Sequence, residues 1–331
     1  MPPNSAGTGV PMDPYDRVDH ELRPALGPFR GWHSRKLSIG PRLAWLIRRL
    51  TRRLGPKPLA SPAWEERRLP GPAGAPPVPV YVINRRPGAA PRPAILHMHG
   101  GGYVIGNARM GLAMLQPLAR ELDCVIVTVD YRLAPDTRFP GSLEDNYSAL
   151  RWLAQNAEDL GVDPRRIVIM GESAGGGHAA MLAIAARDRG ELPIAGQILV
   201  YPMLDDRTGT AAQQAGSHFV WNAASNRFGW SSLLGVPAGS AEVPAGAVPA
   251  RVADLRGLPP AFIGVGNLDL FFEEDLEYAR RLREAGVPVQ LEVIEGAYHG
   301  FDVFRPGAAA SRHFRSAYVA ALRQAFVAAP A

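Results

Sequence analysis

The chain has 331 residues, enough for one large α/β domain with an appendage or for two modest domains. Its hydrophobic content of 47% and charged content of 20% exclude a disordered or fibrous protein. The formal net charge is +5, and arginines gather between residues 48 and 68. Such a basic segment can mark a membrane or nucleic-acid surface, but we interpret it as a solvated helix face and expect no nucleic-acid partner.

The sequence predicts a cytoplasmic protein without stable membrane insertion. Its first residues include Pro, Asn and Asp where a secretory peptide needs a basic start and an apolar core. No stretch approaches the roughly 18 apolar residues of a membrane span. The single cysteine, Cys124, lies in an apolar run and cannot form an intramolecular disulfide, so we expect it to be buried in a strand.

The N-terminal part predicts an arm and a helix. Residues 1 to about 25 are rich in Pro and Gly and predict a loose arm. Between residues 32 and 54, apolar residues recur at helical spacing with arginines between them, which predicts an amphipathic helix whose apolar face is covered. These apolar positions are Leu43, Leu46, Ile47, Leu50 and Leu54.

From residue 94 the pattern alternates between strand and helix, which is typical of a mainly parallel sheet with helices on both faces. An early strand is predicted at 78–83. Further strands are predicted at 94–98, 124–130, 167–170, 197–201, 261–265 and 289–294, and helices near 109–121, 142–157, 174–188, 272–285 and 309–327.

The alternation stops between about residues 203 and 258. This insertion carries Phe219, Trp221, Phe228 and Trp230, which either line a pocket or pack the insertion together. With the N-terminal helix it is placed to form a cap over the carboxyl edge of the sheet, where α/β folds bind ligands. The predicted pocket residues are Tyr103, Phe219, Trp221 and Trp230. The predicted segments are an N-terminal cap segment (1–60), a first core part (61–202), the cap insertion (203–258) and a second core part (259–331).

The pentapeptide G-E-S-A-G at 171–175 fits the pattern G-x-S-x-G. An apolar, mostly β-branched run precedes it, and a run of good helix formers follows it. A strand that turns sharply into a helix presents the serine hydroxyl at the top of a sheet, and the flanking glycines permit the turn. The pattern therefore predicts a nucleophile elbow with Ser173 as nucleophile.

Acyl transfer by a serine also needs a base and a carboxylate that orients the base. His299 follows the last predicted strand, and Asp269 follows the strand before it, so both lie at the same sheet edge as Ser173. The chain order Ser, Asp, His is that of the α/β-hydrolases. A predicted helix begins with the acidic residues Glu273, Glu274 and Asp275. Acidic side chains interact favourably with the positive end of the helix dipole, so we interpret these three as capping residues. Of the other histidines, His178 is expected to point away from the nucleophile, and surface or cap positions are expected for His20, His33, His218 and His313.

Donors for a developing oxyanion are predicted after the strand that ends at residue 98. The glycines at 100–102 can bring bare backbone N–H groups close to a substrate oxygen, and the N–H of Ala174 begins the helix after the nucleophile. His99 and Gly100 are expected to support this loop. His97 and His99 alternate on the strand, which is also compatible with a metal site, but no third ligand has an evident position. We therefore predict no metal.

These ordered motifs resemble the hormone-sensitive lipase family of carboxylesterases, which have a capped α/β-hydrolase fold. The resemblance covers about residues 78–325 and includes D-Y-R-L-A-P at 130–135, L-D-L at 268–270 and H-G-F at 299–301. It implies Gly101, Gly102 and Ala174 as the oxyanion donors, no cofactor, and short to medium acyl esters as substrates. It also implies a homodimer through the last strand, 289–294, which would be an exposed edge in a monomer.

Two positions depart from the family's pattern. Glu172 stands before the nucleophile where Asp or Thr is common, and Leu270 stands where Pro commonly follows the triad carboxylate.

The sequence therefore predicts a serine carboxylesterase that hydrolyses small-molecule esters through an acyl-enzyme on Ser173. An amidase, a lipase or a deacetylase would use the same triad, so these remain alternatives. A non-catalytic ligand-binding protein on a hydrolase scaffold is a further alternative, since plant gibberellin receptors resemble this family but lack a working triad. The intact set of Ser173, Asp269 and His299 argues against it.

Overall fold

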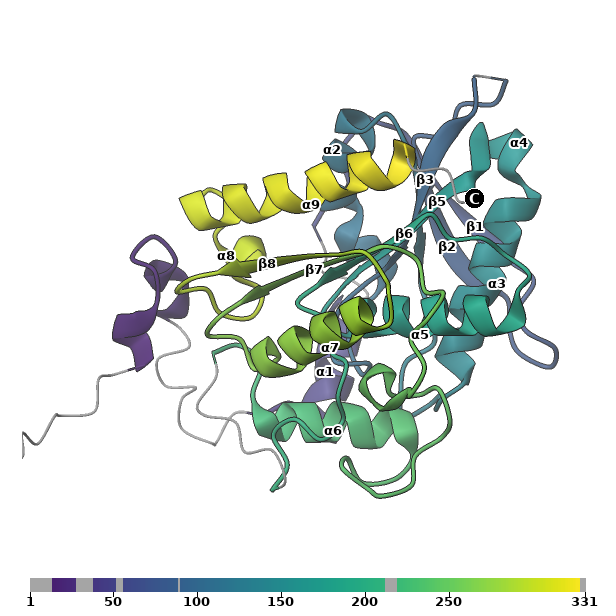
Figure 1. Ribbon diagram of the computed structural model, residues 1–331. Helices are drawn as coiled ribbons and strands as arrows, with labels where there is room; N and C mark the ends of the chain where they lie inside the picture. The colour runs from purple at the N-terminus through teal and green to yellow at the C-terminus, as the bar shows by residue number, and fades with distance from the viewer. Residues whose placement is uncertain (1–13, 28–37, 52–55, 89, 212–218, 328–331) are drawn as a thin grey trace, which may run out of the picture.

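The computed structural model describes residues 14–27, 38–51, 56–88, 90–211 and 219–327. In these ranges eight strands form one sheet in the order β1-β2-β4-β3-β5-β6-β7-β8 (Figure 1). The pairs β1-β2 and β2-β4 are antiparallel and all other pairs are parallel, which confirms the predicted fold class. The strands are β1 (Trp64–Leu69), β2 (Val78–Ile83), β3 (Arg92–Met98), β4 (Val125–Val129), β5 (Val162–Glu172), β6 (Gly196–Val200), β7 (Ala261–Gly266) and β8 (Val289–Ile294).

Helices cover both faces of the sheet (Figure 1). On one face lie α2 (Leu112–Glu121) and α9 (Ala309–Val327), and on the other lie α3 (Gly141–Gln155), α5 (Ala174–Arg189) and α7 (Phe272–Glu284). All residues of β3, β4, β6 and β7 are buried, as expected for strands between two helix layers. The other helical segments are η1 (Pro14–Arg17), α1 (Pro41–Thr51), η3 (Ala108–Gly111), α4 (Ala157–Leu160), α6 (Ala223–Leu234), η4 (Pro249–Arg251) and α8 (Phe301–Phe304).

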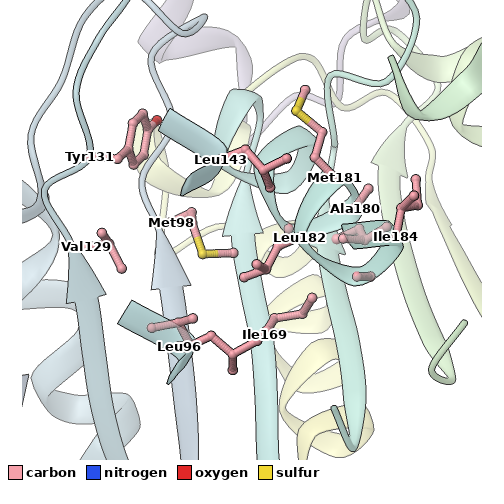
Figure 2. Packing of buried hydrophobic residues seen from close by; sticks show 14 of the residues in the cluster. Leu96, Met98, Val129, Tyr131, Leu143, Ile169, Ala180, Met181, Leu182 and Ile184 are labelled. Atoms are coloured by element: carbon pink, nitrogen blue, oxygen red, sulfur yellow. The ribbon is translucent and has the colours of Figure 1, made fainter. Parts of the chain in front are cut away.

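The helix that begins after Ser173 is the most enclosed helix of the core. From Ala174 to Ile184 every residue of α5 is buried. Figure 2 shows Leu96 of β3, Ile169 of β5 and Leu182 of α5, which belong to one buried apolar cluster. Small residues along α5 let it approach the sheet closely, and this packing holds the first turn of α5, and with it Ser173, in one position.

One strand is missing from the sequence prediction. β1, with the sequence W-E-E-R-R-L, pairs only with β2 and lies at the edge of the sheet. Most of its residues are partly or fully exposed, so it carries charged residues where a central strand would carry apolar ones. The strands predicted from residue 78 onward are all present, and so are the five predicted helices that follow them.

The N-terminal arm is only partly as predicted. Residues 1–13 lie outside the described ranges, but the stretch from 14 to 25 packs on the molecule. Val18 and Leu22 are buried, with Leu26 just beyond them, in the same apolar cluster as α2 and α9. The backbone N–H of Asp19 also donates to the carbonyl of Gly296. Regularly spaced apolar residues therefore anchor a segment whose Pro and Gly content suggested a loose chain.

The amphipathic helix does not include residues 38–40, and its leucine face is not fully covered. The rest of the predicted range, 32–37 and 52–54 with Leu54, lies outside the described residues. Within the described residues it runs from Pro41 to Thr51 as α1, and Leu46 and Leu50 are 44% and 46% exposed. The side that meets the protein contains the buried Ala44 and Arg48. Arg48 donates to the carbonyls of Val104 and Ala134 and pairs with Asp136, so a basic residue of the helix forms its main polar contact with the core.

The segment between β6 and β7 contains α6 and η4 and meets the N-terminal segment. The backbone N–H of Ile39 donates to the Ser225 hydroxyl of α6 at 2.9 Å. α6 also packs closely on the loop after β3, since a Cβ added at Gly229 would lie 2.5 Å from the carbonyl oxygen of Gly102. None of the helices in the described ranges combines the length and hydrophobicity that crossing a bilayer requires.

Candidate active site

Three side chains from three different strand ends meet at the carboxyl edge of the sheet. The Oγ of Ser173, after β5, lies 3.0 Å from Nε2 of His299, after β8. Nδ1 of His299 lies 2.8 Å from Oδ2 of Asp269, after β7. All three residues are buried. Because a carboxylate only accepts hydrogen bonds, the imidazole proton lies on Nδ1, and Nε2 is left free to take the serine proton.

Ser173 sits in a strained turn that its glycine neighbours permit. Its backbone has φ 56° and ψ −122°, a conformation that non-glycine residues rarely adopt. A Cβ added at Gly171 would lie 2.3 Å from the backbone of Gly175, and one at Gly175 would lie 2.0 Å from the carbonyl oxygen of Met98. Both glycines of G-x-S-x-G are therefore needed so that strand, turn and helix can approach one another.

The imidazole of His299 is held between two aromatic rings and one carboxylate. Phe271 and Tyr201 contact it edge-on, with ring centroids at 5.1 and 4.9 Å. The second carboxylate oxygen of Asp269 accepts the backbone N–H of Phe271 at 3.0 Å. Asp269 therefore has one oxygen for the backbone and one for the histidine, which leaves the carboxylate little freedom to rotate.

The glycine loop after β3 lies close to Ser173, and a side chain at either Gly101 or Gly102 would clash with neighbouring atoms. Gly101 and Gly102 have φ values of +129° and +57°. A Cβ at Gly101 would lie 2.1 Å from the carbonyl oxygen of Ile105, and one at Gly102 would lie 2.1 Å from the Trp221 ring. Within the described residues, the backbone N–H groups of Gly101, Gly102 and Ala174 donate to no protein acceptor. Such N–H groups are available to a substrate oxygen.

His99 lies behind this loop. Its Nδ1 contacts the carbonyl of Gly100 at 2.8 Å, and its ring stacks on Tyr131 with centroids 4.3 Å apart. The Tyr131 hydroxyl donates to the carbonyl of His99 at 2.6 Å. Burial lowers the pKa of His99, which keeps the ring neutral and suits a supporting role in the loop.

His178 lies in the same buried aromatic group, with its ring edge-on to Tyr103 and Tyr131. Burial lowers its pKa to about 3, so the ring stays neutral at physiological pH. Among the remaining histidines, His20 and His313 are exposed, while His33 and His218 lie outside the described residues.

The four predicted pocket residues do not share one environment. Trp221 lies against Gly102, and its indole N–H donates to Asn226 at 3.1 Å. Phe219 packs against Tyr298. Tyr103 and Trp230 are almost fully buried against each other, and the Tyr103 hydroxyl donates to the carbonyl of Met203 at 2.8 Å. All four side chains are buried, and a lining role stays a prediction for each of them.

Sequence reasoning missed two residues near His299. The hydroxyl of Tyr201, whose ring contacts His299, donates to Oδ1 of Asp302 at 3.0 Å. Burial raises the pKa of Asp302 to about 6, and the charge of Glu172 acts in the same direction. One signal was available, since Tyr201 directly follows β6 and therefore lies at the sheet edge that carries the site.

Two acidic residues expected to cap α7 are instead buried. Oε1 of Glu274 accepts the backbone N–H groups of Leu204 and Asp205 at 2.7 and 3.2 Å, which ties α7 to the start of the insertion. The carboxyl oxygens of Asp275 have no hydrogen-bond partner among the described residues. Burial raises the pKa of both carboxyls well above the ordinary range, which favours their neutral forms.

Among the described residues, no group of three or more His, Cys, Asp or Glu side chains is arranged to hold a metal ion. His97, which sequence reasoning weighed as a ligand, instead contacts Glu172 and Thr128. Cys124, which was expected in a strand, is buried directly before β4, and burial raises the pKa of its thiol to about 12, which makes it unreactive.

Comparison with known proteins agrees with this fold. The α/β-hydrolase fold family model matches residues 95–303. Esterase LipI of Mycobacterium tuberculosis is 35% identical over 239 residues, which cover 70% of this chain and 73% of the relative. Ethyl acetate hydrolase of Pseudomonas putida is 33% identical over 227 residues, which cover 68% of this chain and 71% of the relative. The solved structure of a bacterial heroin esterase matches with a TM-score of 0.83 at 33% identity, covering 95% of this chain and 99% of that one.

The chain therefore belongs to the α/β-hydrolase fold family. Within this family it is of the hormone-sensitive lipase class of esterases, as its ordered motifs predict.

Proposed function

We propose that this carboxylesterase hydrolyses short- to medium-chain acyl esters through an acyl-enzyme on Ser173. The carboxylesterase activity follows from relatives that are named an esterase, a carboxylesterase and an ethyl acetate hydrolase. The observation that supports the assignment of roles is the hydrogen-bonded chain from Ser173 through His299 to Asp269, with each link at or below 3.0 Å.

The proposed reaction begins when Nε2 of His299 takes the hydroxyl proton of Ser173 as Oγ attacks the acyl carbon. Asp269 stabilises the imidazolium that forms and holds the proton on Nδ1. The N–H groups of Gly101, Gly102 and Ala174 donate to the oxyanion, and Ala174 adds the positive end of the α5 dipole. His299 then gives its proton to the leaving alcohol. Water attacks the acyl-enzyme in the same way and restores Ser173.

The same geometry argues against a protein that only binds ligands. A binding protein has no need to keep a serine in a strained turn, and here Ser173 has a positive φ and faces an imidazole. An amidase, lipase or deacetylase would use the same groups, so substrate choice depends on the pocket around Trp221 and Phe219.

The test is the rate of hydrolysis of p-nitrophenyl esters from acetate to palmitate by wild type and by Ser173→Ala. We expect the substitution to lower kcat by at least about 10⁴-fold, because the nucleophile and its base act as one unit. A fluorophosphonate probe should label the wild type at Ser173 alone. Near-wild-type turnover by a folded Ser173→Ala variant would refute the assignment.

Ser311→Ala is a matched control. Ser311 is also buried, but it lies on α9, and its hydroxyl has no partner among the described residues. This variant should keep wild-type turnover. If wild type hydrolyses no ester but cleaves a p-nitroanilide with dependence on Ser173, the enzyme is an amidase that uses the same triad.

Other expectations stay predictions. These are the cytoplasmic location, the homodimer, the lack of a nucleic-acid partner and the division into a core with a two-part cap. The edge position of β8 and the contact between Ile39 and α6 support the dimer and the cap respectively.

A further inference from the structure

Glu172 and His97 have no part in the reaction described above, yet they contact each other next to it. Nε2 of His97 lies 2.9 and 3.1 Å from the two carboxylate oxygens of Glu172. The His97 side chain is 1% exposed and that of Glu172 is 14% exposed. Glu172 directly precedes the nucleophile, and His97 lies three residues before Gly100, the first glycine of the oxyanion loop. The contact therefore joins the two strand ends that carry the proposed reaction.

The contact extends to a third strand. Nδ1 of His97 lies 2.8 Å from the hydroxyl oxygen of Thr128, which is fully buried and is the register partner of His97 on β4. Because the Glu172 carboxylate only accepts hydrogen bonds, Nε2 of His97 carries a proton. The Thr128 hydroxyl can then donate to a neutral imidazole or accept from a charged one, so every polar atom of this group has a partner.

This side-chain bridge begins where the backbone ladder ends. The last register pair between β3 and β5 is Met98 with Gly171, so no pairing of these two strands joins the next residues, His99 and Glu172, although Glu172 still pairs with Val200 of β6. Just beyond, the two chains touch. A Cβ added at Gly100 would lie 3.0 Å from the carbonyl oxygen of Glu172 and 3.4 Å from Cβ of Ser173. A small slip of one strand end against the other would therefore change the distance from the glycine N–H groups to Oγ of Ser173.

We propose that Glu172 and His97 are positioning residues, whose bridge holds the oxyanion loop at the correct distance from Ser173. Neither side chain needs to touch the substrate for this role. The inference rests on the proposed function, because it assumes that Ser173 attacks and that Gly101 and Gly102 stabilise the oxyanion. It also gives a reason for Glu172, one of the two residues that depart from the family's pattern, since its carboxylate reaches the imidazole of the neighbouring strand.

The role predicts a particular kinetic signature. Oxyanion donors act on charge that develops in the transition state, so their displacement lowers kcat and leaves KM nearly unchanged. Loss of a merely structural ion pair would instead lower the melting temperature and the fraction of active enzyme, while the active fraction kept its normal kcat. Buried ion pairs are weak evidence for stability, so the kinetic measurement is the one that decides.

The experiment compares Glu172→Ala and Glu172→Gln in the full-length enzyme. Enzyme concentration is taken from fluorophosphonate titration, so that only active sites are counted. We expect Glu172→Ala to lower kcat by about 10- to 100-fold, with KM within about twofold of wild type. Glu172→Gln keeps an oxygen that accepts from His97 and should restore kcat to within about threefold of wild type.

A matched pair elsewhere in the chain provides the control. Glu292 on β8 contacts Nε2 of His313 at 2.7 Å, but both side chains are more exposed and far along the sheet from Ser173. Glu292→Ala should leave kcat and KM unchanged. A transition-state analogue such as a boronic acid should bind Glu172→Ala more weakly than wild type, by the factor by which kcat/KM falls. The product carboxylic acid should bind both enzymes equally well.

The outcomes separate this inference from the proposed function. Loss of dependence on Ser173 in the wild type would refute the proposed function and with it the inference. If wild-type turnover depends on Ser173 but Glu172→Ala has a normal kcat per titrated site, the inference alone is overturned. It is also overturned if the kcat of Glu172→Gln is no higher than that of Glu172→Ala. If Glu172→Ala does not fold, Thr128→Val breaks the bridge at its other end, and an unchanged kcat there also overturns it.

Discussion

Replacement of Asp269 by asparagine changes a single atom type and tests how the histidine proton is held. In the native site, Oδ1 accepts the backbone N–H of Phe271 at 3.0 Å, and Oδ2 accepts Nδ1–H of His299 at 2.8 Å. An asparagine has one oxygen and one NH₂ group for these two positions. If its oxygen stays on the Phe271 N–H, its NH₂ group faces Nδ1 of His299, which must then lose its proton and carry it on Nε2.

That tautomer blocks the reaction, because Nε2 would face Ser173 with a proton and could not accept another. The opposite amide orientation places NH₂ against the N–H of Phe271, which is a contact between two donors. Both orientations therefore cost free energy, and the buried setting offers no water to relieve either one. We expect kcat to fall by about 10⁴-fold, which corresponds to about 5.5 kcal/mol of barrier.

The assay is p-nitrophenyl acetate hydrolysis near pH 8, with the thermal unfolding midpoint measured on the same samples. Asp275→Asn is the control, since it makes the same change at a buried carboxyl in the first turns of α7 that has no partner among the described residues. It should keep wild-type activity. The reasoning is refuted if Asp269→Asn retains more than about a tenth of wild-type kcat, or if Asp275→Asn loses as much.

Two further changes follow from the geometry. Gly102→Ala places a Cβ 2.1 Å from the Trp221 ring at a φ of +57°, so kcat should fall by about 10²-fold. The control is Gly88→Ala, which has φ +70° and open space around it and should lower only the unfolding midpoint. Equal kcat values for the two variants would contradict this reasoning. Burial raises the pKa of Asp302 from 3.8 to about 6, so the folded protein holds a proton that the unfolded chain has lost, and stability falls as pH rises between these values. Asp302→Asn should therefore become more stable relative to wild type across that window, and parallel curves of unfolding midpoint against pH would argue against the raised pKa.

The central strands were predictable because they are buried on both faces and consist of short apolar runs. β1 was not, because an edge strand carries charged residues that mimic a loop. The burial of α1 was not predictable either: its regular leucine spacing predicted a covered face, but Leu46 and Leu50 are exposed. Periodicity shows that a helix forms; its burial depends on what packs against it.

The triad residues were predictable for a different reason. Each lies in the turn or loop that follows a strand, and the carboxyl ends of parallel strands meet at one edge. Chain order and strand position were therefore enough to bring Ser173, Asp269 and His299 together. The glycines of the elbow and of the loop at 100–102 carried a local signal as well, because only glycine tolerates the close backbone contacts found there.

By itself, then, the sequence determined the parallel sheet, the sharp turn at Ser173 and the meeting of Ser173, Asp269 and His299, because strand burial, turn sterics and chain order are local properties. The tertiary structure alone decided which residues support them. Tyr201 and Asp302 meet across 101 positions, and His97 and Glu172 across 75. No periodicity or spacing encodes such pairs, since they depend on the register and order of strands that are distant in the chain.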